Sequence, residues 1–88
     1  MKPPAIALLN PIIADKQYEG MFDGDPRIGE LAEALVGRMD SSLFDEEVIH
    51  AVRTAGQSLS FSAMTQALEQ LYDYADRKQI WLGDPHPS

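Results

Sequence analysis

The sequence predicts an all-α fold: a three-helix domain, made of a helix-helix hairpin and a preceding helix, with an extended N-terminal arm. Apolar residues recur at helical spacing in three stretches of the 88-residue chain, and each stretch begins at a residue that favours a helix N-terminus. Three of the six prolines precede the first stretch, where they disfavour helix. We expect a homodimer, because a core this small gains from sharing surface.

The expected domain boundaries follow from the prolines and the turn residues. We expect residues 1–24 to form the arm, 25–83 the three-helix domain and 84–88 a flexible tail. No helix is expected before about residue 24, because proline biases the preceding residue toward extended conformations. The arm carries several apolar residues that should lie against another surface: Ile6, Leu8, Leu9, Ile12 and Ile13.

The first helix is expected to begin with Asp25 as N-cap and Pro26 at the first helical position, and to end near Met39. Gly29 and Gly37 lie inside it and each costs about 1 kcal/mol relative to Ala. They indicate either close approach of another backbone or a marginally stable helix. The expected apolar face consists of Ile28, Leu31, Ala32, Leu35, Val36 and Met39.

The second helix is expected to begin at Ser42, since Ser42 and Asp45 resemble a capping box, and to stop at Gly56 in a left-handed conformation. Its expected apolar face consists of Leu43, Phe44, Val48, Ala51, Val52 and Ala55.

The third helix is expected to begin at Ser60 or Ser62 and to run to Gly83. One apolar stripe is expected to pack on the other two helices, with self-association as the alternative: Phe61, Met64, Leu68, Leu71 and Ala75. A second line on the same helix contains Tyr74, Arg77 and Trp81, a combination enriched at binding hot spots. The alternative for Trp81 is that it packs with Ile80 under the arm.

The charge of the chain limits its partners. The formal net charge is -7, and residues 21–50 carry eight acidic residues against two arginines. Such a surface repels phosphate and attracts a basic protein, so we expect no direct binding to nucleic acid. The chain has no cysteine, no signal-peptide pattern and no apolar run long enough for a membrane span. We therefore expect a soluble, cytoplasmic protein without membrane contact.

Catalytic and metal motifs are incomplete. Asp23 and Asp25 have the spacing of the first two ligands of a calcium loop, but Arg27 and Ile28 break the pattern. Glu30 and Glu33 lack the histidine of a di-metal motif, and the sequence contains neither a nucleophile elbow nor a glycine-rich phosphate loop. His50 and His86 are not placed as ligands or bases. We expect no catalytic, metal or cofactor site.

The function expected from these patterns is non-enzymatic binding of another protein, by a small regulatory protein that occludes a partner's surface. A stoichiometric inhibitor, an anti-activator, an immunity-type protein and an adaptor all fit, and a basic protein or a transcription regulator fits as partner. Two alternatives remain: an acidic mimic of nucleic acid that blocks a DNA-binding protein, and a purely structural homodimeric subunit. The expected partner-binding residues are Ile6, Leu8, Leu9, Ile12, Ile13, Tyr74, Arg77 and Trp81.

Overall fold

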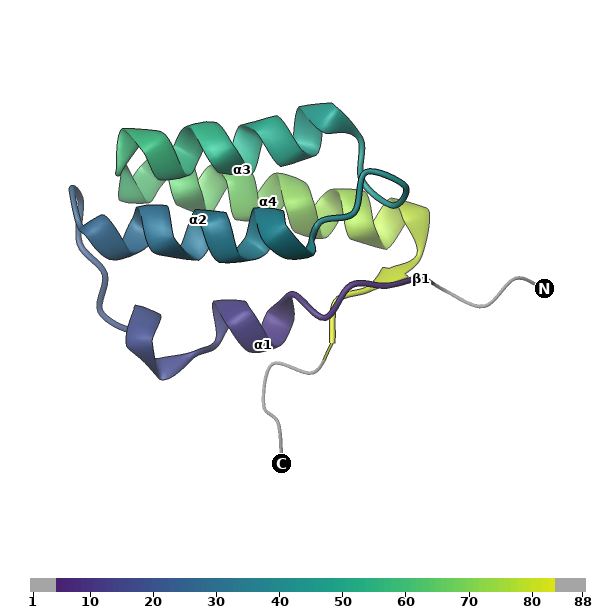
Figure 1. Cartoon of the computed structure of the whole chain (residues 1–88), viewed down its shortest axis with the longest axis horizontal. Helices are drawn as coiled ribbons and strands as arrows, with labels where there is room; N and C mark the ends of the chain where they lie inside the picture. The colour runs from purple at the N-terminus through teal and green to yellow at the C-terminus, as the bar shows by residue number, and fades with distance from the viewer. Residues whose placement is uncertain (1–4, 84–88) are drawn as a thin grey trace.

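Three helices, α2 (Pro26–Arg38), α3 (Glu46–Ser58) and α4 (Phe61–Lys78), form the body of the protein in the computed structural model, which describes residues 5–83. In Figure 1, α2 lies between α3 and the N-terminal segment, and α4 packs on α3. The all-α expectation is therefore confirmed at the level of a mostly helical, compact fold. The tail expected at residues 84–88 lies outside the described residues.

Helix α2 forms as the sequence predicts. It begins at Pro26, and the side chain of Asp25 accepts a hydrogen bond of 2.9 Å from the backbone N–H of Arg27. This bond satisfies one of the amides that the first turn leaves without a partner in the helix. The helix buries one apolar face against the core: Ile28, Leu31, Ala32 and Leu35.

The side chain of Arg27 ties the N-terminal segment to the beginning of α2. Its guanidinium donates to Asp25 Oδ2 from Nε at 2.9 Å and from Nη2 at 2.6 Å. It also donates to the carbonyl oxygens of Gln17, Glu19 and Gly20, at 2.9, 3.0 and 3.3 Å. Asp25 is only 3% exposed. The side-chain hydrogen bonds from Arg27 outweigh burial, which alone would raise the pKa of this carboxyl, and they hold the pKa below its usual range.

Helix α3 differs from the expectation at both ends. It begins at Glu46, after the extended residue Asp45, so the expected capping box at Ser42 is wrong. Ser42 instead lies in a turn in which its backbone N–H donates to the Asp40 carboxylate at 2.9 Å. A side chain such as that of Asp40, by accepting a hydrogen bond from a nearby backbone N–H, offers the backbone an alternative to starting a helix. The left-handed residue at the other end is Leu59, with φ 54°, and not Gly56.

Gly56 lies inside α3 because α2 crosses at that point. A Cβ on Gly56 would overlap the Cβ of Ala32 and lie 3.6 Å from the Cα of Gly29. Gly29 lies at the same crossing, but a Cβ there would meet the carbonyl oxygen of Gly56 at 3.5 Å, an ordinary van der Waals contact, so the crossing requires glycine only at position 56. Gly37 is different, because a Cβ there would meet nothing within 4 Å among residues 5–83.

Helix α4 begins as predicted and ends earlier than predicted. Ser60 caps it by accepting a hydrogen bond of 3.2 Å from the backbone N–H of Ala63. It ends at Lys78, followed by Gln79 in the left-handed conformation, so the expected continuation to Gly83 is wrong. Within the predicted stripe, Phe61 is 45% exposed and lies outside the core, whereas the later residues are buried or half-buried: Met64, Leu68, Leu71 and Ala75.

The N-terminal segment contains short regular elements that the sequence did not predict. These are the strand β1 (Ala5–Ile6), the helix α1 (Asn10–Ile13) and the 3-10 turn η1 (Lys16–Tyr18). The expectation of no helix before residue 24 is therefore wrong, since Pro11 sits in the first turn of α1, where its missing N–H costs no hydrogen bond. Strand β1 pairs in parallel with β2 (Ile80–Trp81), which follows α4 (Figure 1).

Two glycine substitutions test the crossing of α2 and α3. Gly56→Ala should destabilise the protein by about 1–3 kcal/mol, because the added methyl group overpacks against Ala32. Gly37→Ala should instead stabilise the isolated chain by up to about 1 kcal/mol, because alanine favours helix and a Cβ there meets no described atom of the same chain within 4 Å. Urea unfolding followed by circular dichroism measures both. Equal effects of the two substitutions would contradict this account of the crossing.

The Asp25 carboxylate should make stability depend on pH. The native state favours its ionised form, so this contribution is present above the ordinary Asp pKa of about 3.9 and is lost as pH falls through the lower native pKa. Asp25→Asn keeps a helix cap but removes the charge. It should lower the free energy of unfolding at pH 7, and its difference from wild type should shrink below about pH 4. A difference that stays constant across the acid range would refute this role.

Candidate protein-binding surface

Strands β1 and β2 bring the two ends of the described chain together. Ala5 pairs with Ile80 and Ile6 with Trp81 in parallel register. The pairing continues beyond the strands, where Ala7 N–H donates to Trp81 O at 2.9 Å. Asn10 donates twice, from its backbone N–H to Leu82 O at 2.7 Å and from its side-chain amide to Gly83 O at 2.8 Å. Residues 80–83 are thus fixed on the N-terminal segment.

Side chains alternate between the inside and the outside of this pair, as the strand period of two requires. The inward residues Ala7, Leu9, Ile80 and Leu82 are all buried. The outward residues are large and exposed: Ile6 by 58%, Leu8 by 41% and Trp81 by 51%. Ile6 and Trp81 are register partners, so they lie side by side on one face. We call Ile6, Leu8 and Trp81 the outer patch.

The backbone beneath the outer patch adopts an unusual conformation. Leu8 has φ 53°, a left-handed conformation that costs a residue with a side chain about 1–2 kcal/mol. It packs against Gly83, which has φ 94° and at which a Cβ would lie 3.0 Å from Pro11 Cδ and 3.3 Å from Leu8 Cδ2. Such local strain persists only where surrounding contacts enforce it, and it is common at binding sites.

The other apolar residues predicted in the arm pack against the chain itself. Leu9 is fully buried, and Ile12 and Ile13 on α1 are half-buried against the core. Of the five arm residues predicted to contact a partner, the structure leaves Ile6 and Leu8 exposed. Leu9, Ile12 and Ile13 hold the segment in place.

The predicted line of Tyr74, Arg77 and Trp81 does not form one surface. Tyr74 is 7% exposed, and its hydroxyl accepts from Asp45 N–H at 3.2 Å and donates to Leu43 O at 3.3 Å. Its ring therefore belongs to the core. Arg77 is exposed and forms an ion pair with Asp73 at 3.3 Å. Trp81 has left the helix and joined β2, so helical spacing no longer relates it to the other two.

Two exposed phenylalanines lie near the N-terminal end of α4, away from the outer patch, and the sequence did not predict them as surface residues. Phe22 is 61% exposed and Phe61 45% exposed. Their segments are held together, because Phe61 N–H donates to the Asp23 carboxylate at 3.1 Å and Gly24 N–H donates to Leu59 O at 2.7 Å. The signal in the sequence was a phenylalanine within a turn, Gly20 to Gly24, that no helical face could bury.

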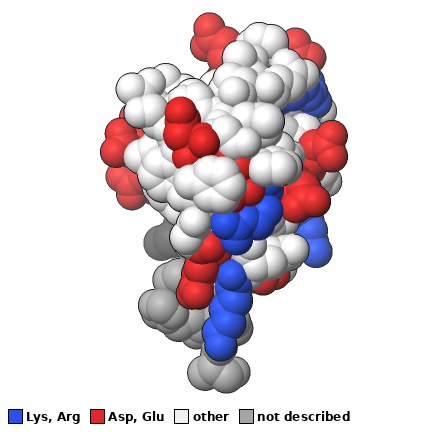
Figure 2. Space-filling model, turned by 90° about the vertical axis from the view of Figure 1, so that its left-hand side faces the viewer, with Lys and Arg blue, Asp and Glu red and all other residues white. Residues whose placement is uncertain are grey.

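The charges on the end of the molecule shown in Figure 2 do not form a continuous acidic track. Acidic side chains occur on several sides of this face, separated by uncharged surface, and Lys and Arg gather in its lower half. One of the eight acidic residues of 21–50, Asp25, is buried and neutralised by Arg27.

Within residues 5–83, no three His, Asp or Glu side chains lie close enough to share a metal ion. No helix in that range is both long and apolar enough to cross a membrane. Comparison of the chain with protein-family models, with curated proteins and with solved structures finds no match.

The buried position of Tyr74 can be tested with a matched pair. Tyr74→Phe should destabilise the protein by about 1–3 kcal/mol, because Leu43 O and Asp45 N–H lose their partner while the ring stays. Tyr72→Phe makes the same chemical change on a side chain that is 41% exposed and should cost about 0.5 kcal/mol or less. Urea unfolding of both variants measures this difference, and equal values would place Tyr74 outside the core.

Proposed function

We propose that this protein is a non-enzymatic binding module that contacts another protein through the outer patch. The observation that carries the proposal is the exposure of Ile6 and Trp81 side by side on a hydrogen-bonded backbone, with the exposed Leu8 two residues beyond Ile6. Contiguous apolar patches on soluble proteins commonly mark interaction sites. Tryptophan is the residue type most typical of binding hot spots.

The rigidity of the backbone supports this use. The pairing of Ala7 with Trp81 and of Asn10 with Leu82 orders the patch before a partner arrives. Binding to this ordered patch therefore costs less conformational entropy than binding to a mobile segment would. Apolar contact at the patch supplies affinity, and the net charge of -7 attracts a basic partner.

The module would act by occlusion, covering a surface that its partner uses elsewhere. A stoichiometric inhibitor, an anti-activator, an immunity-type protein and an adaptor share this mode of action, and a transcription regulator is a suitable target. We place it in the cytoplasm as part of the same proposal. The acidic-mimic alternative is weaker, because Asp25 is buried and Glu46 and Glu47 lie in the first turn of α3, where the helix dipole already favours them.

Substitution of the patch tests the proposal. Ile6→Ser with Trp81→Ser should weaken partner capture by about 30-fold or more, the loss typical of a hot-spot residue. The matched control is Phe22→Ser with Phe61→Ser, which removes similar exposed apolar side chains at the other end of α4 and should leave capture unchanged. Circular dichroism of each variant shows whether the fold is retained.

Two further readouts separate this proposal from an acidic mimic. Trp81 is the only tryptophan in the chain, so its emission should shift to the blue when a captured partner is titrated in. Binding should also weaken only modestly with added salt, because salt screens the attraction of a basic partner to the net charge but not the apolar contacts of the patch. Steep loss of binding with salt, together with an unchanged Trp81 emission, would favour the acidic mimic instead.

A further inference from the structure

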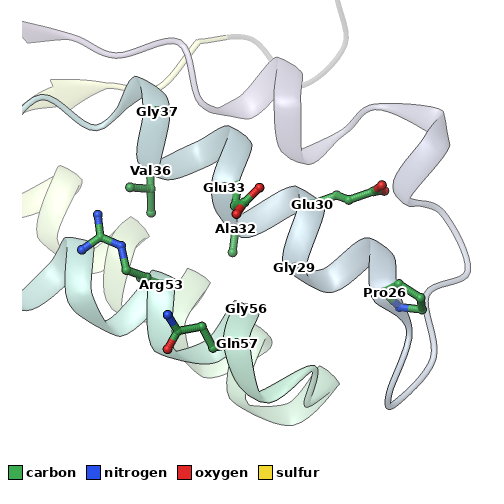
Figure 3. Close-up of a pocket in the computed structure, with 10 residues that line it drawn as sticks. All are labelled: Pro26, Gly29, Glu30, Ala32, Glu33, Val36, Gly37, Arg53, Gly56 and Gln57. Carbon is green, nitrogen blue, oxygen red and sulfur yellow. The ribbon is translucent and has the colours of Figure 1, made fainter.

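A cleft of about 700 Å³ lies between α2 and α3, apart from the outer patch. Small or half-buried residues of both helices line it, and longer polar side chains stand at its sides (Figure 3). In Figure 3, Arg53 rises from α3 toward Val36 of α2, and Gln57 stands one turn further along α3. The lining residues near its centre are Gly29, Ala32, Val36 and Gly56.

The cleft presents one charge of each sign, on opposite helices. Glu33 on α2 and Arg53 on α3 are both exposed, and neither forms an ion pair within the described part of the chain. Glu30 points away from α3 in Figure 3. Its charge acts on the N-terminal side: the pKa of Arg27 is raised mainly by the hydrogen bond to Asp25 and that of Tyr18 mainly by burial, and Glu30 adds to both. Glu33 and Arg53 are therefore the charges that the centre of the cleft offers to an occupant, and Glu46 stands further along, beside Ile49.

The backbone positions of Glu33 and Arg53 stand at nearly the same level along the cleft, and the Arg53 side chain extends from there toward Val36 (Figure 3). Helices α2 and α3 run antiparallel (Figure 1), and Gly56 touches both Gly29 and Ala32, so its level falls between those two residues. With a rise of about 1.5 Å per residue, one turn from this crossing brings Glu33 and Arg53 opposite each other. By the same measure, Gly37 lies opposite Ile49.

We propose that the cleft binds a second copy of this chain, with a two-fold axis parallel to the helices. Such an axis places α2 of one copy over α3 of the other and keeps every residue at its own level. Glu33 of each copy then meets Arg53 of the other, and both pairs form at once. An axis running across the cleft would instead place α2 of one copy over α2 of the other, so Glu33 would not face Arg53, and the charges select the first arrangement.

The uncharged residues fit the same arrangement. Ile49 is half-buried and lies in the continuation of the cleft beside Val36. In the dimer it faces Gly37 of the other copy, where the missing side chain leaves open space. Gly37 weakens α2, and no neighbour within 4 Å in the described part of its own chain explains it. Close packing of a second copy explains it.

Charge reversal tests this dimer with the intact protein. Glu33→Arg alone and Arg53→Glu alone should each raise the dimer dissociation constant by about tenfold or more, because like charges then face each other twice. Mixing these two variants should restore association, since the heterodimer again pairs opposite charges at both positions. Sedimentation velocity and native mass spectrometry measure the association. A salt concentration of about 150 mM, at which the Debye length is about 8 Å, limits the general repulsion between two acidic chains.

The matched control is Glu69→Arg, an exposed position on α4 with the same change in charge. Glu69→Arg alone should leave the wild-type dimer intact. Mixed with Arg53→Glu, it should form less heterodimer than Glu33→Arg does, because only the difference in overall charge then favours association. A monomeric wild type, a dimer indifferent to Glu33→Arg, or a Glu33→Arg and Arg53→Glu mixture no better than the control mixture would each overturn the proposal. These results do not depend on Ile6 or Trp81, so the dimer and the proposed function can fail separately.

Discussion

The arrangement of the N-terminal segment depends on the guanidinium of Arg27. It satisfies three backbone carbonyl oxygens in residues 17–20 while it pairs with the buried carboxylate of Asp25. A lysine could not replace it, because only the planar guanidinium directs five donors in fixed directions. The segment is thereby held on α2, and β1 reaches β2 at the other end of the molecule (Figure 1). The outer patch exists because of this path, since Ile6 and Leu8 come from one end of the chain and Trp81 from the other.

The second constraint is the absence of a side chain at Gly56. It lets α2 and α3 approach until Gly56 touches Ala32 and Gly29, and this contact sets their relative level along the cleft. The positions of Glu33 and Arg53 follow from that level. One glycine therefore governs both the packing of the core and the charge pattern on the face that we assign to the second copy.

Local signals were sufficient for the parts of the fold that depend on local chemistry. Asp25 followed by Pro26 marks the start of α2, and Ser60 marks the start of α4, because capping bonds join residues only two or three positions apart. The sequence could not show that Gly56 serves a helix crossing and not a helix stop, since its neighbour Ala32 belongs to another helix. The pairing of Ile6 with Trp81 was hidden for the same reason, and helical periodicity wrongly extended α4 through Trp81. Tyr74 looked like a surface residue until its contacts with Leu43 and Asp45 were known.

The two proposed surfaces use different elements of the fold, and their combination has a consequence of its own. The outer patch lies on β1 and β2, whereas the cleft lies between α2 and α3, so forming the dimer does not use up the patch residues. A dimer would then carry two outer patches related by the two-fold axis. A partner that is itself a symmetric dimer could engage both, and the second contact would form at the high effective concentration of a tethered site. Self-association through the cleft would thereby strengthen binding through the patch without any new contact to the partner.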